Sequence, residues 1–561
     1  MCFLSLAVGI IAGLGAWVFR MLIGLFHNLF FLGQFQFVYD ANRHTSENPC
    51  CAGIVFAPVI GAIIVAWIVK TFAPEAKGHG VPEVMDAIYY QGGNIRPVVA
   101  VVKSLASAIC IGSGGSVGRE GPIVQIGSAF GSTVGQLLNV PARQRITLVA
   151  AGAAGGIAAT FNAPLGGIVF AIELLLVSVN VRTLLPVSIA TVTATYIGQL
   201  LLGTHPSFDL EVLRTVDFQL QPPGTLLLFI PFGLLMGLAS ILFVKGIYWS
   251  EDAFDAMPGN VYTRHCTGML IVGLILWGMF QWKQEYFVEG VGYGTIMDVL
   301  AGRLTDPGFL LLLGGLKLLT TFLTLGSGGS GGVFSPSLFI GATLGAAVGY
   351  ALQKLFPALS IDILMFAIAG MAAVMGASTG AIITGSVMLR EMTDDDNVVL
   401  PVIVATVIAC GVRKWFSPGS VYTLKLMRRG HVVPEGLQAA LDDARNVSHV
   451  MSSDYQVVEE DAEHGPSYDV VTIVTVDGEL KGVIGPWQWS LHPHDAGAMC
   501  RYVLVSPSEP LLSALRKMQM VQASVAVVTT TTESHQVANV VGVLTRREMI
   551  RYRGQLAELF A

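Results

Sequence analysis

Long apolar segments dominate the chain up to about residue 430 and are absent after it. Two runs of 27 residues, Ile146–Ile172 and Ile363–Leu389, contain no charged side chain. Each is longer than the roughly 20 residues that a helix needs to cross the apolar core of a bilayer. The pattern predicts an all-α polytopic membrane protein. Further mainly apolar stretches lie at Met1–Tyr39, Cys51–Phe72, Leu184–Leu202, Leu226–Val244, Gly268–Phe280, Phe309–Leu325 and Val398–Val412.

Glycine and proline interrupt many of these apolar stretches. The chain has 64 glycines in 561 residues, and they concentrate at the breaks. Broken helices are tolerated at membrane depth only where the freed backbone groups face protein or a water-filled cavity. We therefore expect interrupted helices that surround a site. The opening MCFLSLAVGIIAG has no basic n-region, so it predicts a first helix and not a signal peptide.

Composition narrows the classes of function. Only 12% of the residues are charged, 53% are hydrophobic and the mean hydropathy is +0.65, which argues against a soluble enzyme. The net charge of −6 provides no basic surface for nucleic acid, which is not expected as a partner. The 7 cysteines include no CxxC and no cysteine–histidine pairing at zinc spacing, so neither a disulfide framework nor a metal site is predicted.

The apolar region contains a duplicated unit. Placing Gly112–Gly135 over Gly326–Gly349 gives twelve identical residues in 24. Duplicated halves with interrupted segments at matching positions are typical of transporters whose binding site lies between the halves, near the membrane midplane. The halves are expected at about 50–205 and 225–425, and the sequence leaves open whether they are inverted or parallel. Two further blocks match in the same order, Gly78–Ile88 with Gly290–Leu300 and Leu148–Leu174 with Phe366–Met392.

The character of the chain changes after about Arg429. Charged residues become frequent, and no apolar run is long enough to span a bilayer. We predict a transmembrane domain over 1–430 and a soluble α/β domain over 431–561. The basic stretch MRRG at Met427–Gly430 favours the cytoplasmic side for the soluble domain. A helix is expected at Pro510–Met520, and strands are expected at Val470–Val476, Gly482–Ile484, Ser524–Thr529 and Val540–Leu544.

Three glycine- and proline-containing segments predict helix N-termini that bind an anion. Pro82, Pro122 and Pro336 each follow a glycine-containing turn. Proline suits the first turn of a helix, and glycine lets the backbone turn its amides toward a ligand. Free N–H groups and the positive end of the helix dipole then form an anion site. Three such helix starts can hold one small anion without a buried cation, which would bind the ion too tightly for rapid release.

The first of the repeated segments carries Glu120 where the second has Phe334. An ionisable residue at membrane depth is costly and by default functional. The carboxylate could occupy the site meant for a transported anion, and protonation would vacate that site. Two alternatives stay open: Glu120 could only pair with Arg119, and Phe334 could be either a constriction or ordinary packing.

Five motifs occur in the order found in one family: GHGVPE (Gly78–Glu83), GREGP (Gly118–Pro122), FNAPLGGIVFAIE (Phe161–Glu173), GGVFSP (Gly331–Pro336) and LREMTDD (Leu389–Asp395). With these motifs, residues 1–430 resemble the CLC family of chloride channels and chloride/proton exchangers. The resemblance implies an inverted-repeat helical fold and a homodimer with an ion pathway in each subunit. It also implies that Glu120 is the gating glutamate. The anion-binding set that it implies is His79, Gly80, Arg119, Gly121, Val333, Phe334 and Tyr422.

The segment GHGVP departs from the family pattern at His79. Most members read GSGIP, whose serine hydroxyl usually coordinates chloride, or GPGIP, which marks nitrate-preferring members. The imidazole can donate an N–H to an anion and titrates near neutral pH. It could also turn away and leave only backbone amides as ligands, so the choice between chloride and nitrate stays open.

A second departure concerns the proton path. In many exchangers of the family two adjacent carboxylates end the FNAPL motif, and the second delivers protons from the cytoplasm. Here Glu173 is kept and Leu174 fills the second position. Glu120 and Tyr422 favour Cl⁻/H⁺ antiport in which water replaces the second carboxylate. The alternative is a passive chloride channel gated by voltage or pH, because channels of the family also have an apolar residue at that position.

The soluble tail resembles a pair of CBS domains. Asn446–Val457 resembles the opening of a first module, and Val540–Ile550 resembles the end of a second. No central helix is evident over 458–468, so the first module is expected to be degenerate. Thr545 and Glu548 could contact the ribose of an adenine nucleotide, and no other cofactor is expected. A purely structural dimerisation element is the alternative.

Two other classes of function fit the sequence less well. A cation channel or magnesium transporter with CBS domains would need carboxylates facing a pore, and acidic positions in the membrane domain are few. An intramembrane enzyme would need a nucleophile with a base, or metal ligands, and no HExxH motif occurs. We therefore predict a non-enzymatic transporter of chloride and protons in the lipid of a bacterial inner membrane.

Overall fold

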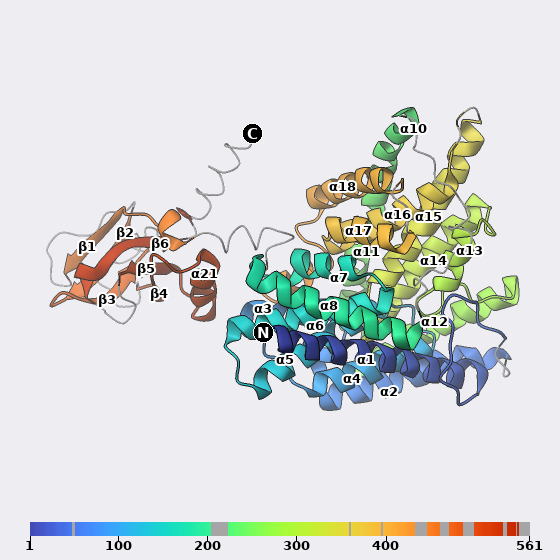
Figure 1. Ribbon diagram of the computed structural model, residues 1–561, viewed down its shortest axis with the longest axis horizontal. Coiled ribbons are helices and arrows are strands. Elements are labelled where there is room, and N and C mark those ends of the chain that lie inside the picture. The colour runs from blue at the N-terminus through green and yellow to red at the C-terminus, as the bar shows by residue number, and fades with distance from the viewer. Residues whose placement is uncertain are drawn as a thin grey trace. The chain divides into compact units, whose positions relative to one another are not determined.

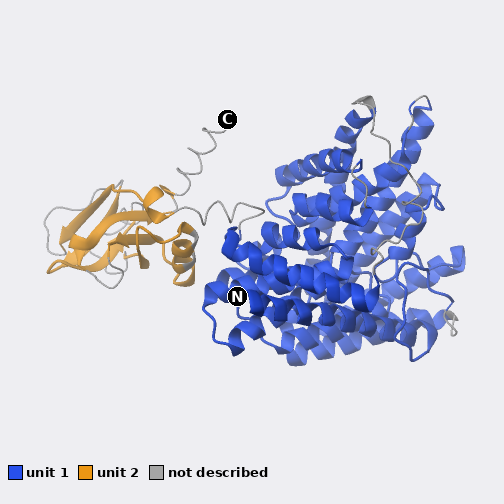
Figure 2. Ribbon diagram, in the orientation of Figure 1, with its two compact units in different colours: residues 1–436 blue, residues 437–561 orange. Residues whose placement is uncertain are grey.

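The computed structural model of the chain divides into two compact units, 1–436 and 437–561 (Figure 2). The boundary predicted from the sequence, 430/431, lies a few residues before this division. Each unit is described by itself. The structure describes residues 1–47, 51–203, 223–357, 359, 361–393, 397–431, 433, 446–459, 470–485, 499–530, 536–545 and 547–548.

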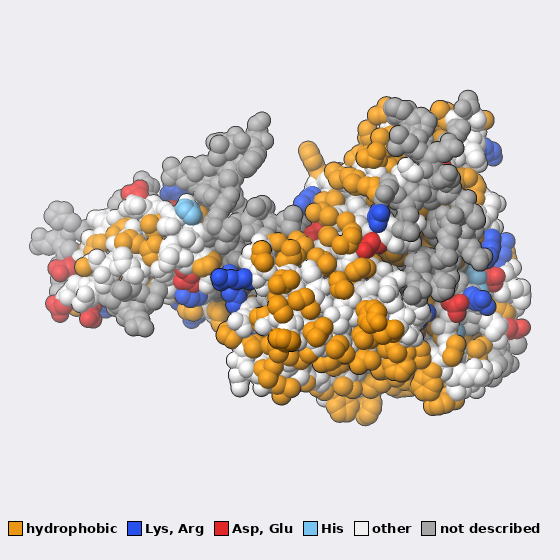
Figure 3. Space-filling model, viewed as in Figure 1, with side chains coloured by type: hydrophobic (Ala, Val, Ile, Leu, Met, Phe, Trp, Pro, Cys, Tyr) orange, Lys and Arg blue, Asp and Glu red, His pale blue; other side chains and the backbone are white. Residues whose placement is uncertain are grey.

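Unit 1 is helical (Figure 1). Within the described ranges, 8 helical segments are long and apolar enough to cross a membrane. Figure 3 shows hydrophobic side chains over much of the visible face of this unit. These observations confirm the predicted multi-pass membrane protein. The helices are α1 (Cys2–His27), α2 (Ala57–Phe72), α3 (Val81–Tyr90), α4 (Val98–Gly112), α5 (Glu120–Leu137), α6 (Ala142–Phe161), α7 (Pro164–Phe170), α8 (Val181–Leu202), α10 (Pro223–Leu227), α11 (Phe229–Ala256), α12 (Val261–Lys283), α13 (Tyr293–Leu300), α14 (Pro307–Gly326), α15 (Phe334–Leu355), α16 (Ile363–Thr379), α17 (Ile382–Thr393), α18 (Val399–Phe416) and α19 (Thr423–Arg428), with short helical turns at Asn28–Leu32, Cys51–Val55, Pro74–Ala76 and Ala171–Leu175.

The two uncharged runs of 27 residues do not form single spanning helices. Asn162 ends α6 with a φ of 56°, and Gly380 ends α16 with a φ of 81°. The left-handed conformation stops each helix, and the short helices α7 and α17 follow. The two breaks are repeat equivalents, 218 residues apart. The predicted interruption of helices at matching positions is therefore confirmed.

Equivalent glycines bring the long helices of each half together. Gly127 of α5 lies against Gly152 of α6, and Gly341 of α15 lies against Gly370 of α16. At each position a Cβ would overlap the backbone of the facing helix, so a larger residue would push the helices apart. The same close packing therefore occurs in both halves, as the duplicated sequence predicts.

The two halves meet at the starts of α5 and α15. Gly118 N–H donates to the Gly332 carbonyl at 2.7 Å, and Gly332 N–H donates to the Gly118 carbonyl at 2.6 Å. The two glycines are repeat equivalents and pair in an antiparallel bridge. A second bridge, between Gly78 and Ser330, joins the segment before α3 to the same region. The Gly-rich segments of both halves are thus hydrogen-bonded to each other.

Unit 2 contains two three-stranded sheets of the same topology. In each sheet the first two strands are parallel and the last two are antiparallel, with an irregularity in the antiparallel register. The sheets are β1 (Tyr455–Glu459), β2 (Val471–Val476) and β3 (Glu479–Ile484), and β4 (Tyr502–Val505), β5 (Val525–Thr529) and β6 (Val540–Thr545); the helix is α21 (Leu511–Met520).

The four strands and the helix that the sequence predicts in unit 2 are present, whereas β1 and β4 are not predicted. β5 is buried along its whole length and β2 along all but its last residue, which gives both a continuous apolar pattern. β1 and β4 are only partly buried, so their apolar pattern is weaker. The sequence shows no central helix of a first module over 458–468, and most of that range lies outside the described residues.

Candidate functional site

The N-termini of α3, α5 and α15 meet inside unit 1. Gly80 caps α3 with a φ of 84°, which glycine adopts without strain. A Cβ on Gly80 would lie 2.9 Å from the carbonyl oxygen of Gly121, and a Cβ on Gly121 would lie 3.0 Å from the Cα of Gly332. Only glycine allows this approach. The predicted convergence of three helix starts is confirmed.

Glu120 is buried at this convergence, with 1% of its surface exposed. Its carboxylate accepts hydrogen bonds from the Ser335 hydroxyl at 2.6 Å, from the Ser335 N–H at 3.3 Å and from the Tyr293 hydroxyl. Ser335 is the second residue of α15, so the Glu120 carboxylate lies at the N-terminus of that helix. The carboxylate therefore has the surroundings that a bound anion would have.

Arg119 contributes little to holding Glu120. Its Nε lies 4.0 Å from the carboxylate and, among the described residues, has no hydrogen-bond partner. The guanidinium instead lies over the ring of Tyr293, 5.1 Å from its centroid. The alternative that Glu120 is satisfied mainly by its neighbour is therefore not supported. A small pocket next to Arg119 is lined by Ala16, Phe19, Arg20, Arg119, Thr160 and Leu202.

Phe334 begins α15, and Val333 caps that helix. The Phe334 side chain is 3% exposed, and its ring centroid lies 5.4 Å from that of Phe161. Phe161 ends α6 in the first half, so the contact joins the two halves. This contact accounts for the burial of Phe334 by packing, and a role as a constriction stays a prediction.

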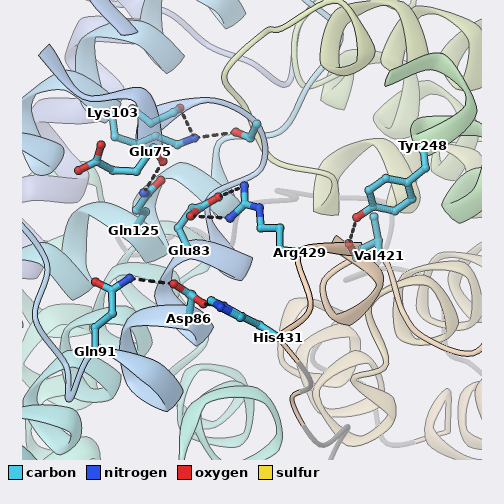
Figure 4. Close-up of polar contacts among 12 residues, drawn as sticks. Glu75, Glu83, Asp86, Gln91, Lys103, Gln125, Tyr248, Val421, Arg429 and His431 are labelled. Carbon is cyan, nitrogen blue, oxygen red and sulfur yellow. Dashed lines mark hydrogen bonds and ion pairs between the residues drawn. The ribbon is translucent and has the colours of Figure 1, made fainter. Parts of the chain in front are cut away.

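Tyr422 and His79 approach each other beside the helix starts. The N–H of Val421 donates to the Ser378 carbonyl at 2.8 Å, and the Tyr248 hydroxyl donates to the Val421 carbonyl at 2.5 Å (Figure 4). These bonds fix the backbone just before Tyr422. Its ring centroid lies 6.1 Å from that of His79. The His79 ring is buried, and its Nδ1 has no hydrogen-bond partner within the described ranges.

Two buried lysines hold the Gly-rich segments in shape. Lys103 on α4 donates to the carbonyls of Ala76 and Gly78 at 3.0 and 2.7 Å, directly before His79 (Figure 4). Lys317, its repeat equivalent on α14, donates to the Gly290 carbonyl at 2.8 Å. Each ammonium group is satisfied by backbone oxygens of the turn that precedes a helix. The lysines therefore hold the backbone of these turns in place.

Glu173 caps a helix of the other half. Its carboxylate accepts from the N–H groups of Ile383 and Thr384 at 3.1 and 2.8 Å, at the start of α17. Glu391 of the second half in turn caps α7 of the first half: its carboxylate accepts from the Gly166 N–H at 2.6 Å. This reciprocal capping explains both glutamates structurally. Glu173 is thus turned toward α17, and the adjacent Leu174 is 5% exposed.

Thr545 and Glu548 contact each other in unit 2. The Thr545 N–H donates to a Glu548 carboxylate oxygen at 2.9 Å, and the Thr545 hydroxyl donates to the same oxygen. A ribose would have to compete with Thr545 for this carboxylate. The pair is therefore arranged as a local cap at the end of β6.

Two residues that hold Glu120 were missed by reasoning from the sequence. Ser335 lies within the GGVFSP motif, so its hydroxyl could have been considered with the helix start. Tyr293 lies in GVGYG of the second half, whose equivalent in the first half is Val81, so the repeat gave no signal for it. Lys103 and Lys317 could have been found, because they are equivalent positions in otherwise apolar segments.

Comparison with known proteins identifies the family. The family model "Voltage gated chloride channel" matches residues 61–414. The H(+)/Cl(-) exchange transporter ClcA of Vibrio cholerae serotype O1 (strain M66-2) is 34% identical over 439 residues, which cover 76% of this chain and 89% of that protein.

Two solved structures share the fold. The crystal structure of a slow cyanobacterial Cl⁻/H⁺ antiporter matches with a TM-score of 0.66 and 23% identity over 76% of this chain and 97% of that one. The structure of a eukaryotic CLC transporter matches with a TM-score of 0.64 and 19% identity over 98% of this chain and 97% of that one. By family model, sequence and fold, the chain belongs to the voltage gated chloride channel family, the CLC proteins.

Proposed function

We propose that this protein exchanges chloride for protons across a membrane, with Glu120 as the gate. The observation that carries the proposal is the Glu120 carboxylate, buried at the N-terminus of α15 and hydrogen-bonded to Ser335 and Tyr293. Curated relatives that are 34% and 35% identical are named H(+)/Cl(-) exchange transporters, which supports this choice. A carboxylate that competes with an anion for helix-terminal amides couples anion movement to protonation.

The mechanism follows from this competition. The charged carboxylate takes the strong hydrogen bonds from Ser335 that chloride would otherwise receive. Protonation removes the charge, so chloride can replace the side chain among the amides of α15, near Val333 and Phe334. The guanidinium groups of Arg20 and Arg119 line the pocket beside this region and attract anions to it. Tyr422 and His79 complete the proposed anion site.

The arrangement in the membrane is part of the same proposal. The two halves are inverted repeats, two copies of the chain form a homodimer in lipid, and the membrane is the inner membrane of a bacterium. Arg429 forms two hydrogen bonds, at 3.0 and 2.8 Å, to Glu83 in the first turn of α3 (Figure 4). The basic Met427–Gly430 stretch therefore lies beside the N-terminus of α3. Because basic residues favour the cytoplasmic side, unit 2 lies in the cytoplasm.

Chloride flux from proteoliposomes tests the proposed class of function. Purified full-length protein in liposomes loaded with chloride should release it when an ionophore balances the charge. A cation channel or an enzyme would release no chloride above protein-free liposomes. Liposomes with no chloride release would contradict the proposal.

His79 is expected to set the preference among anions. Its buried Nδ1 has no hydrogen-bond partner in the described part of the chain, and the ring lies near Tyr422, where an N–H could donate to the ion. A hydrogen bond to a charged group contributes about 1.5 kcal/mol, so His79→Ser should change the ratio of nitrate to chloride flux by up to about tenfold. The measurement is the relative flux of the two anions in the same liposomes. An unchanged ratio would leave only backbone amides as ligands at this segment.

Unit 2 is proposed to be a pair of CBS domains. Its two sheets have the same strand order and the same combination of parallel and antiparallel pairing, as expected for two copies of one module. Their core is shared, because buried residues of β2, β3, β5 and β6 form one cluster. An adenine nucleotide at Thr545 and Glu548 stays a prediction.

A further inference from the structure

A histidine and two carboxylates from three separate segments converge in unit 1. His44 lies between α1 and α2, Glu285 lies between α12 and α13, and Asp298 lies on α13. One ligand atom from each residue lies within 4.8 Å of the other two. His44 Nε2 is 2.7 Å from Asp298 Oδ2 and 3.4 Å from Glu285 Oε2. The residues are far apart in sequence, so motif spacing could not have revealed this group.

Two of the three side chains, those of Asp298 and His44, are held in place, and the third, that of Glu285, is open to solvent. Arg303 Nη1 donates to Asp298 Oδ1 at 2.8 Å, which leaves Oδ2 directed at His44. The His44 ring packs against Phe287 at a centroid distance of 5.3 Å. The side chains of His44 and Asp298 are 19% and 11% exposed, and that of Glu285 is 39% exposed. A metal ligand whose carboxylate is fixed by a second hydrogen bond is typical of preformed metal sites.

The charge of the group suits a divalent cation. A neutral imidazole with two carboxylates carries two negative charges. Metal ligands bind as a neutral imidazole and charged carboxylates, so a divalent cation would neutralise this charge.

We propose that His44, Glu285 and Asp298 bind a divalent transition-metal ion of the zinc class. Imidazole with carboxylate ligands suits zinc and its neighbours better than magnesium or calcium, which prefer oxygen ligands alone. Water completes the coordination shell, because the half-exposed side of Glu285 is open to solvent.

The same helix links this metal site to Glu120. Asp298 lies five residues after Tyr293 on α13, and the Tyr293 hydroxyl donates to the Glu120 carboxylate. A metal ion that joins α13 to the His44 segment restrains Tyr293 in the contact that holds Glu120. We therefore expect zinc to inhibit transport. This expectation rests on the proposed function.

Binding is tested by titrating zinc into the purified full-length protein in a calorimeter. Loss of one ligand should weaken binding at this site by at least about tenfold in His44→Ala. The conservative Glu285→Gln change should weaken it as well, and its half-exposed position makes misfolding a poor explanation. The matched control is His431→Ala, because His431 Nδ1 pairs with Asp86 at 2.5 Å without a third ligand among the described residues. Equal zinc affinity in the wild type and both site variants would overturn the metal site.

Inhibition is tested separately in proteoliposomes with zinc on both sides. The ratio of chloride flux with and without zinc should fall in the wild type and in His431→Ala, and should stay near one in His44→Ala. A wild-type flux that saturating zinc does not change would overturn the link to Glu120, whatever the calorimetry gives. A wild type that moves no chloride at all would contradict the proposed function and leave the binding result standing.

Discussion

Replacing Glu120 with glutamine is expected to preserve chloride flux while removing its dependence on pH and its coupling to protons. The amide keeps the size of the side chain, and its oxygen can accept from the Ser335 and Tyr293 hydroxyls, which both donate to Oε1 in the wild type. The amide carries no charge and takes up no proton. In the wild type protonation removes the charge that competes with chloride, so flux should rise as the pH falls. In Glu120→Gln the same pH series should give a flat profile.

The measurement is chloride release from proteoliposomes over a series of pH values, with the protein amount matched. Glu391→Gln is the control, because it makes the same chemical change in a carboxylate that caps α7 and lies outside the proposed anion site. That variant should keep the pH dependence of the wild type. A Glu120→Gln profile as steep as that of the wild type would mean that another group is the gate.

The duplicated sequence predicts much of the fold because packing follows the repeat closely. Gly127 and Gly341 stand at one offset in the alignment and make the same close helix contact in each half. Pro82, Pro122 and Pro336 predict helix starts, and the three helices do start there. These features depend on local conformation and on small side chains, which a sequence displays directly.

Contacts between segments that are far apart in the chain are harder to predict from the sequence. Tyr293 reaches Glu120 only because α13 and α5 come together in the fold, and no spacing in the chain encodes that approach. Glu173 is the first of the two carboxylate positions that end the FNAPL motif in many exchangers, and its carboxylate accepts hydrogen bonds from the amides of α17. Its repeat equivalent Glu391 gave the available signal, since a glutamate present in both halves is more simply explained by shared packing. A glutamate that is present in one half only, as Glu120 is, is a better indication of a chemical role.

Transport is expected to be coupled to protons although Leu174 occupies the inner relay position. Leucine carries no proton, and Glu173 is turned away toward α17, so neither residue continues a path from Glu120. Tyr422 and His79 carry hydrogen-bonding groups beside the proposed anion site, and water joined to them could complete the path. Such waters need two or more polar partners each, which the hydroxyl, the imidazole and the free helix-terminal amides can supply.

Proton uptake driven only by a chloride gradient decides between exchange and passive conduction. With the membrane potential clamped by potassium and valinomycin, a coupled exchanger must move protons against their own gradient while chloride runs down its gradient. Glu120→Gln liposomes are the matched control, because they should pass chloride and accumulate no protons. If the wild type also passes chloride without uphill proton movement, Leu174 has the same consequence as in the channels of the family. The protein would then be a chloride channel whose opening, and not its stoichiometry, depends on protonation of Glu120.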